Sequence, residues 1–239
     1  MRRVLVTGGG SGIGRAVARA FAGAGDAVTI AGRRRDALEE TARGFAMDVR
    51  VADVTDEAQV AALFDAPFDV VVANAGAGKA ARLKDTSLEL WNDTLAVNLT
   101  GVFLTFRAAY PGMGEGGRLI ALASTASLKG GPAVAAYAAA KHGVLGLVRS
   151  LALEVAKSGI TVNAVCPGYV DTPLTEAAVA GLMARKGIGE AEAMAMVTGG
   201  NPVGRLISTE EVVAAVMFLA SPAASMVNGH ALAVTGGEI

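Results

Sequence analysis

Short apolar runs alternate along the chain with segments whose apolar positions repeat at the helical period. The runs are brief and are bounded by Gly, Asn or charged residues, which is typical of buried strands; we expect strands at residues 4–6, 27–31, 47–52, 69–73, 117–123, 160–166 and 231–234. Amphipathic or apolar helices are expected at residues 15–24, 87–110, 133–157 and 209–220. This alternation, with no polar linker between the halves, predicts one α/β domain over residues 1–239. Its fold class would be a doubly wound parallel sheet of about seven strands with helices on both faces.

Residues 174–205 interrupt this alternation. The stretch is alanine-rich and helical in character, but Gly187 and Gly189 break it. We expect a mobile pair of short helices that covers the substrate. Met183, Met194 and Met196 suit irregular apolar ligands, although methionines at helical spacing also fill cores.

Composition limits the classes of partner. The chain of 239 residues has 52% hydrophobic residues, and its 21 basic and 22 acidic residues form no blocks of either sign. This balance gives no electrostatic footprint for nucleic acid or an anionic membrane. No apolar run reaches the ~20 residues that span a bilayer, and the start lacks the pattern of a signal peptide. With Cys166 alone there is no internal disulfide, so we expect a soluble cytoplasmic protein.

The first strand runs directly into a glycine-rich turn. Its sequence is Thr-Gly-Gly-Gly-Ser-Gly-Ile-Gly, with Gly8, Gly12 and Gly14 at the positions that matter, and a helix follows at once. A strand, glycine turn and helix in this order favour phosphate binding, because the glycines let the backbone approach and the helix N-terminus offers free N–H groups. A turn rich in glycine only for packing is the alternative.

Tyr137 and Lys141 stand four residues apart on the expected helix at 133–157. Side chains at this spacing are neighbours on one helix face. An ammonium beside a phenol favours the phenolate and lowers the tyrosine pKa, so Tyr137 would serve as a general acid or base toward a substrate oxygen. The alternative is a core tyrosine with an exposed lysine.

These motifs together resemble the short-chain dehydrogenase/reductase family along nearly the whole chain. The TGxxxGxG turn, Asn74-Ala75-Gly76, Asn98, Ser124 thirteen residues before Tyr137, and the segment 166–172 follow the order and spacing of that family. The resemblance implies a Rossmann-type sheet and the catalytic residues Ser124, Tyr137, Lys141 and Asn98. Ser127 and Thr125 are local rivals of Ser124, and Asn98 has the simpler interpretation of a satisfied core amide. The segments before residues 47 and 68 look shorter than is usual, which predicts trimmed helices there.

The resemblance also implies the residues that bind a nicotinamide cofactor. The second strand ends in Arg33 and Arg34 with no acid at that position, while Asp36 is assigned to the following helix. Guanidinium groups there suit the 2′-phosphate of NADP(H), so NADP(H) is favoured and NAD(H) remains possible. The expected cofactor-binding residues are Gly8, Ser11, Gly12, Ile13, Gly14, Arg33, Arg34, Asp53, Val54, Asn74, Ala75, Gly76, Tyr137, Lys141, Pro167, Gly168, Val170 and Thr172.

The function implied is hydride transfer between NADP(H) and a small-molecule ketone or secondary alcohol. The scaffold segments look most like those of β-ketoacyl reductases and 3-hydroxyacyl-CoA dehydrogenases, which favours a 3-oxoacyl thioester. Two alternatives stand: an NAD-dependent dehydrogenase of a small or cyclic secondary alcohol, and a nucleotide sensor without turnover. No metal site is expected. The resemblance further implies a homotetramer packed through the helices at 87–110 and 133–157.

Overall fold

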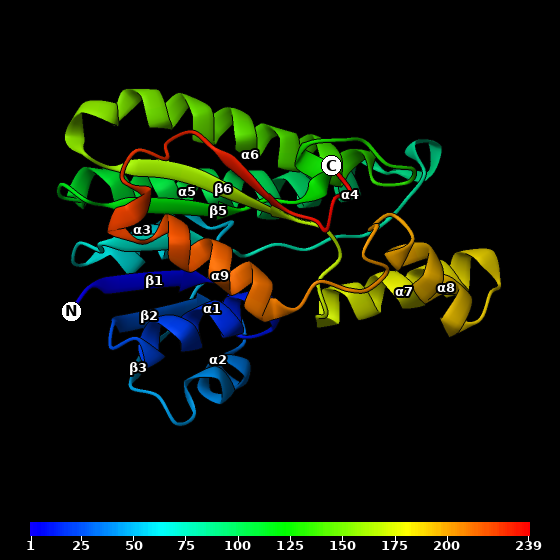
Figure 1. The fold of residues 1–239 in the computed structure, drawn as a ribbon, viewed down its shortest axis with the longest axis horizontal. Helices are drawn as coiled ribbons and strands as arrows, with labels where there is room; N and C mark the ends of the chain where they lie inside the picture. Colours follow the sequence, from blue (N-terminus) through cyan, green and yellow to red (C-terminus); the bar gives the residue numbers. More distant parts are fainter.

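The computed structural model describes all 239 residues and contains one parallel sheet of seven strands (Figure 1). The strand order is β3-β2-β1-β4-β5-β6-β7, so the order reverses between β1 and β4. In open α/β sheets, ligands bind beyond the carboxyl ends of the strands at such a reversal. The strands are β1 Arg3–Thr7, β2 Ala27–Gly32, β3 Met47–Val51, β4 Val70–Ala73, β5 Arg118–Leu122, β6 Thr161–Pro167 and β7 Ala231–Val234.

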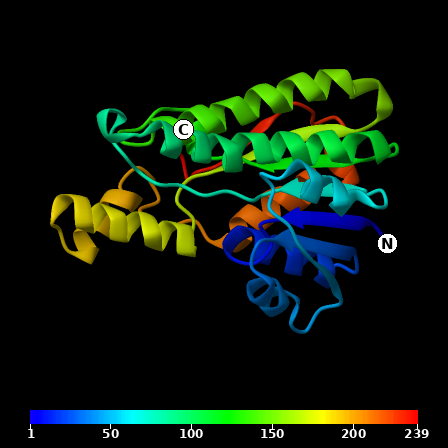
Figure 2. The ribbon, with the colours of Figure 1, turned by 180° about the vertical axis from the view of Figure 1, so that it is seen from behind.

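Helices cover both faces of the sheet because successive strand side chains point to opposite sides. Val4 and Val6 pack with α1 Gly12–Gly23, α2 Arg35–Ala42 and α9 Thr209–Leu219. Leu5, between them, packs on the other face, with α5 Gly101–Ala109 and α6 Ala135–Glu154 (Figure 2). The short α3 Glu57–Ala61 and the helix α4 Leu88–Leu95 belong to this second layer. The expected doubly wound fold is confirmed.

The helix expected at 87–110 is divided. Ser87 caps its start by accepting a hydrogen bond from the Leu90 N–H at 3.1 Å. After α4, one π-helical turn at Ala96–Thr100 widens the helix before α5 continues. Asn98 lies in this turn and is fully buried. The spacing of apolar residues does not predict a π turn, because the apolar positions continue through it.

The other boundaries differ from the expectations by a few residues. The helix expected at 133–157 begins at Ala135 because Ala133 has a φ of 61°, a left-handed conformation that a helix does not admit. It ends at Glu154 and is followed by a 3₁₀ turn at Ala156–Ser158. The helix expected at 15–24 begins earlier, at Gly12. The helices α2 and α3 are short, as expected from the shortened stretches before residues 47 and 68.

Two helices stand apart from the sheet, α7 Pro173–Lys186 and α8 Glu190–Thr198 (Figure 1). Gly187, with a φ of 67°, ends α7. Met183 and Met194 pack against the small cluster of Val179, Ala193 and Val197 between the two helices, whereas Met196 is 46% exposed. Two of the three methionines are therefore packing residues of the helix pair itself.

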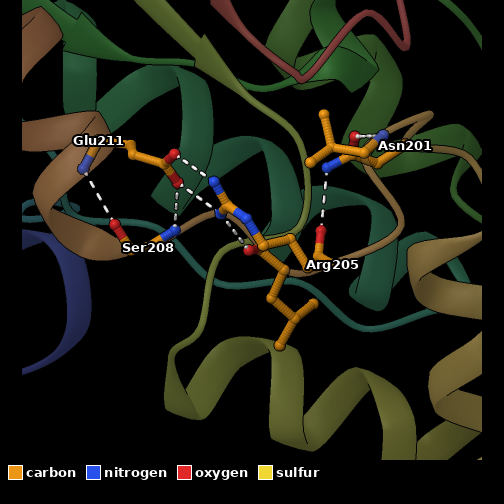
Figure 3. A network of polar contacts seen from close by, with 6 residues as sticks. Asn201, Arg205, Ser208 and Glu211 are labelled. Atoms are coloured by element: carbon orange, nitrogen blue, oxygen red, sulfur yellow. Dashed lines mark hydrogen bonds and ion pairs between the residues drawn. The ribbon is translucent and has the colours of Figure 1, made fainter.

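A polar network ties this helix pair back to α9 (Figure 3). Arg205 pairs with Glu211 at 2.6 Å, and the Asn201 amide donates to the Arg205 carbonyl at 2.9 Å. Ser208 and Glu211 form a capping box at the start of α9. The loop that leaves α8 is therefore held in place at its α9 end. None of the helices is both long and apolar enough to cross a bilayer.

Candidate active site

A large cleft opens at the carboxyl edge of the sheet and has a volume of about 1340 Å³. The glycine turn, the ends of β2 to β6, the start of α6 and the inner side of α7 contribute to its walls. Nearly all the residues expected from the sequence line it. They are Gly8, Ser11, Gly12, Ile13, Arg33, Arg34, Asp53, Val54, Asn74, Ala75, Gly76, Ser124, Tyr137, Lys141, Pro167, Gly168, Val170 and Thr172. Gly14 and Asn98 lie behind the wall.

The glycine turn admits no side chain at its critical positions. Gly8 and Gly12 have φ values of 67° and 50°. A Cβ on Gly14 would lie 2.3 Å from the Gly8 carbonyl oxygen. The turn therefore needs glycine for its own geometry, and it places the first N–H groups of α1, which have no partner within the helix, at the cleft. This cradle fits a pyrophosphate.

Asn74 has a structural role in the same wall. Its side-chain amide donates to the carbonyl oxygens of Thr7 at 3.0 Å and Gly8 at 3.2 Å. The Thr7 hydroxyl in turn accepts from the backbone N–H groups of Asn74 and Ala75. The end of β4 is thus bonded to the glycine turn. Thr7 was not expected as a site residue, but it is part of this arrangement. The one feature of the sequence that could have marked it is its position before the first glycine.

Two arginines stand free at the end of β2. Arg33 and Arg34 are exposed, line the cleft and form no ion pair. Arg35, which follows, pairs with Glu39 within α2, and Asp36 lies in the first turn of that helix, as expected. No carboxylate therefore occupies the position at the end of β2, and two guanidinium groups are available there to an anion.

Ser124 is the second residue after β5 and caps the start of a 3₁₀ turn over Thr125–Ser127. Its hydroxyl oxygen accepts from the Ala126 N–H at 3.1 Å, and its own N–H donates to the Ser127 hydroxyl at 3.2 Å. Ser127 is 2% exposed and does not line the cleft, whereas Ser124 and Thr125 do. Of the two serines, only Ser124 offers its hydroxyl to the cleft.

Lys141 is buried below Tyr137 on α6. Its ammonium donates to the Leu122 carbonyl oxygen at 2.8 Å and lies 5.7 Å from the centroid of the Tyr137 ring. Burial lowers the pKa of Lys141 to about 8. Burial also raises the pKa of Tyr137 above its usual value, the Ser124 hydroxyl counteracts this in part, and Tyr169 adds to it. The expectation of a lowered tyrosine pKa is wrong, because desolvation of the phenolate outweighs the hydrogen bond from Ser124.

The amide of Asn98 makes three hydrogen bonds to backbone groups, which leave its oxygen one free acceptor position. Its nitrogen donates to the carbonyl oxygens of Ala77 at 2.7 Å and Thr94 at 2.9 Å, and its oxygen accepts from the Ala77 N–H at 3.2 Å. The side chain therefore connects the π turn to the loop after β4. A Cβ on Gly76 would lie 3.0 Å from the Asn98 oxygen and 3.8 Å from the Lys141 nitrogen. Asn98 and Lys141 thus both approach Gly76 on the side where a Cβ would lie.

The cleft is also lined by side chains that were not expected as site residues from the sequence, among them Tyr169, Lys129 and Glu238. Tyr169 follows Pro167-Gly168 and is close enough to affect the pKa of Tyr137. Lys129 comes from the loop after Ser124, and Glu238 comes from the segment after β7. The one feature of the sequence that could have marked Tyr169 as a site residue is its position directly after Pro167-Gly168. Nothing local marks Lys129 or Glu238, because their pairing joins distant parts of the chain.

Comparison with known proteins gives matches over almost the full length. A family model described as enoyl-(acyl carrier protein) reductase matches residues 8–238. Cis-4-hydroxycyclohexanecarboxylate dehydrogenase of Sinomonas cyclohexanicum is 42% identical and covers 99% of this chain and 96% of its own. D-beta-hydroxybutyrate dehydrogenase of Rhizobium meliloti is 36% identical, with 99% and 98% covered. The crystal structure of an actinorhodin polyketide ketoreductase variant with NADPH has a TM-score of 0.92 and 36% identity, with 99% and 97% covered.

The buried Lys141 predicts a specific pH dependence of stability. Its folded pKa of about 8 lies below its unfolded value of 10.5, so the unfolded chain binds more protons between these pH values. Stability therefore rises with pH over this window. Relative to Lys141→Met, the wild-type free energy of unfolding should rise by about 2 kcal/mol between about pH 7.5 and pH 10, measured by urea unfolding. The exposed Lys157→Met is the control; a pH-independent difference for Lys141→Met would contradict the burial of a charged amine.

Proposed function

The chain belongs to the short-chain dehydrogenase/reductase family, and from this premise we propose that it reduces a 3-oxoacyl thioester with NADPH. As a member it is an NAD(P)-dependent oxidoreductase that acts on a ketone or a secondary alcohol. One observation carries the proposal: Ser124, Tyr137 and Lys141 lie in a single cleft with the glycine turn and the free arginines.

The bound cofactor supplies the hydride, and the chain supplies alignment and a proton. The Ser124 hydroxyl donates a hydrogen bond to the substrate carbonyl oxygen. Tyr137 then transfers its phenolic proton to that oxygen as negative charge develops. The raised pKa of Tyr137 keeps it protonated at neutral pH, which suits reduction. In the reverse direction the same groups would oxidise a secondary alcohol once the phenol has lost its proton.

Lys141 and Asn98 act beside this pair. The Lys141 ammonium holds the start of α6 against the end of β5 and, in the proposal, binds the nicotinamide ribose and stabilises the Tyr137 phenolate. Asn98 fixes the loop after β4 through Ala77 and completes a proton relay from Lys141 to water. Its three backbone bonds explain why an amide is required at that position, since a carboxylate has no N–H to donate.

The helices α7 and α8, within residues 174–205, are proposed to cover the substrate. Their inner side lines the cleft with Leu174, Leu182 and Met196, which suits an acyl chain. A polyketide ketoreductase is among the similar structures, in agreement with an acyl substrate. The two similar dehydrogenases are named for hydroxy acids, one of them cyclic. A small or cyclic secondary alcohol is therefore the second candidate.

NADP(H) is proposed over NAD(H) because of the free guanidinium groups at the end of β2. Arg33 and Arg34 have no ion partner, and no carboxylate of β2 is available to accept ribose hydroxyls. Asp53 lines the cleft one strand further and is proposed to contact the adenine amino group. A similar structure was solved with NADPH, which supports the same assignment.

We also propose a cytoplasmic homotetramer. Leu88, Phe103 and Leu153 are 73%, 40% and 81% exposed on α4, α5 and α6, the helices that the family resemblance assigns to subunit contacts. Apolar side chains of this size on neighbouring helices favour coverage by a second copy. The one cysteine, Cys166, is free and buried, in agreement with a reducing compartment.

The Tyr137→Phe variant tests the function. Wild type should reduce acetoacetyl-CoA with NADPH, and the variant should lose about 10³-fold in kcat because the proton donor is gone. NADPH binding, measured by fluorescence titration, should change less than about twofold. Tyr110→Phe, an exposed phenol outside the cleft, is the control.

Three results would change the assignment. Unaltered turnover in Tyr137→Phe would exclude Tyr137 as the acid. Turnover of cyclic ketones without any turnover of the thioester would favour the second candidate, and cofactor binding without any turnover would favour a nucleotide sensor.

The Arg33→Ala variant tests the cofactor. It should raise KM for NADPH by about 10- to 100-fold, the range expected for losing a charge-assisted bond to phosphate. KM for NADH should stay within about twofold, as should both values in Arg35→Ala, whose guanidinium pairs with Glu39. Wild-type preference for NADH in initial-rate measurements would disprove the NADP(H) assignment.

The Leu153→Asp variant tests the assembly. Wild type should elute in light-scattering chromatography with about four times the 24.0 kDa mass of the chain. A charge at this exposed position should reduce the mass to that of a dimer or monomer, because it would be buried without a partner. Leu83→Asp, 72% exposed on a turn outside these helices, should leave it unchanged. A wild-type monomer would refute the proposal.

A further inference from the structure

An ion pair stands in the wall of the cleft and has no part in the mechanism above. The Lys129 ammonium lies 2.8 Å from the Glu238 carboxylate, and both residues line the cleft. Lys129 belongs to the segment that follows Ser124, and its N–H donates to the Thr125 carbonyl oxygen at 3.0 Å. The backbone of Lys129 is therefore held in place close along the chain to Ser124, the proposed carbonyl-binding residue.

The carboxylate of Glu238 is enclosed. Its side chain is 11% exposed, against 45% for Lys129. A Cβ on Gly168 would lie 2.8 Å from one carboxylate oxygen, and a Cβ on Gly200 would lie 3.2 Å from the other. Glu238 thus fills the space between the loop after β6 and the end of α8, and Lys129 is its one ion partner.

The backbone before Glu238 brings it to this position. Gly236 and Gly237 have φ values of 62° and 91°, which other residues adopt at a cost. A Cβ on Gly236 would lie 2.2 Å from the Asn201 side-chain oxygen, so the segment passes close to the loop that leaves α8. The carboxylate is consequently placed at the cleft by the fold rather than by the flexibility of a free terminus.

This arrangement sets the charge at the substrate end. An unpaired lysine beside a bound ketone would attract a substrate carboxylate. Here Lys129 is already paired with the Glu238 carboxylate, which repels a second anion. Lys79, Arg185 and Lys186 also line the cleft and are exposed, as Lys129 is, but none of them forms an ion pair. Only the cation nearest in sequence to Ser124 is neutralised.

We propose that Glu238 is a specificity-determining residue, which by pairing with Lys129 makes the site select uncharged 3-oxo esters and thioesters over free 3-oxo acids. The inference rests on the proposed reduction at Ser124 and Tyr137, and it adds the discrimination between neutral and anionic ketones.

Two pairs of ketones test the proposal, each an ester and its free acid: methyl acetoacetate with acetoacetate, and methyl 4-oxocyclohexanecarboxylate with its acid. Wild type should favour the ester in kcat/KM. Glu238→Gln, which keeps the size of the side chain, should raise kcat/KM for the acid about tenfold and change that for the ester less than about threefold. Lys129→Met in the Glu238→Gln background should remove the gain, because the freed ammonium is its source.

Glu57→Gln is the matched control, since it removes one carboxylate of an ion pair, with Arg107, outside the cleft. A gain in Glu57→Gln of the same size, or equal changes for ester and acid in Glu238→Gln, would overturn the proposal and leave Glu238 a packing role. Turnover of the esters without turnover of acetoacetyl-CoA would refute the thioester assignment while the ester-to-acid ratios still decide the role of Glu238. Turnover of acetoacetyl-CoA without turnover of either pair would refute the role of Glu238 alone, and turnover of none of these ketones would refute both proposals.

Discussion

The bond from the Lys141 ammonium to the Leu122 carbonyl joins the two elements that the active site requires. Lys141 lies on α6 one turn after Tyr137, and Leu122 ends the strand that delivers Ser124. A charged amine placed among core residues loses its hydration, and its pKa falls to about 8. Burying the amine costs free energy. The hydrogen bond from Lys141 to the Leu122 carbonyl also fixes the position of the Tyr137 hydroxyl relative to that of Ser124.

The same burial explains why reasoning from the helix spacing alone predicts the wrong direction for the tyrosine pKa. Spacing brings the amine of Lys141 near the ring of Tyr137, but the proton donors of that amine are directed to a backbone carbonyl. Desolvation of a phenolate then dominates the electrostatics. A proton donor with a raised pKa is well matched to ketone reduction. Oxidation by the same groups requires the phenol to lose its proton first.

Much of the fold follows from local sequence signals. Short β-branched runs such as Val4 to Val6 place alternate side chains on two faces, and the glycine turn has to be glycine because a Cβ on Gly14 has no room. The π turn at Asn98 was not predictable, since it changes the backbone bonding without changing the apolar period. Nor was the start of α6, which is fixed by the left-handed Ala133. The pairing of Lys129 with Glu238 depends on the tertiary path of the last strand and has no local signal.

The two ends of the cleft differ in whether their positively charged side chains are paired with a carboxylate. At the end of β2, Arg33 and Arg34 form no ion pair, so their guanidinium groups are available to bind an anion. Beside Ser124, Lys129 is neutralised by a carboxylate that the backbone holds in an enclosed position. A ligand with its phosphates at one end and an uncharged carbonyl at the other satisfies both environments. A ligand with a carboxylate next to the carbonyl would have to displace Glu238 from Lys129 and from its place between the loop after β6 and α8.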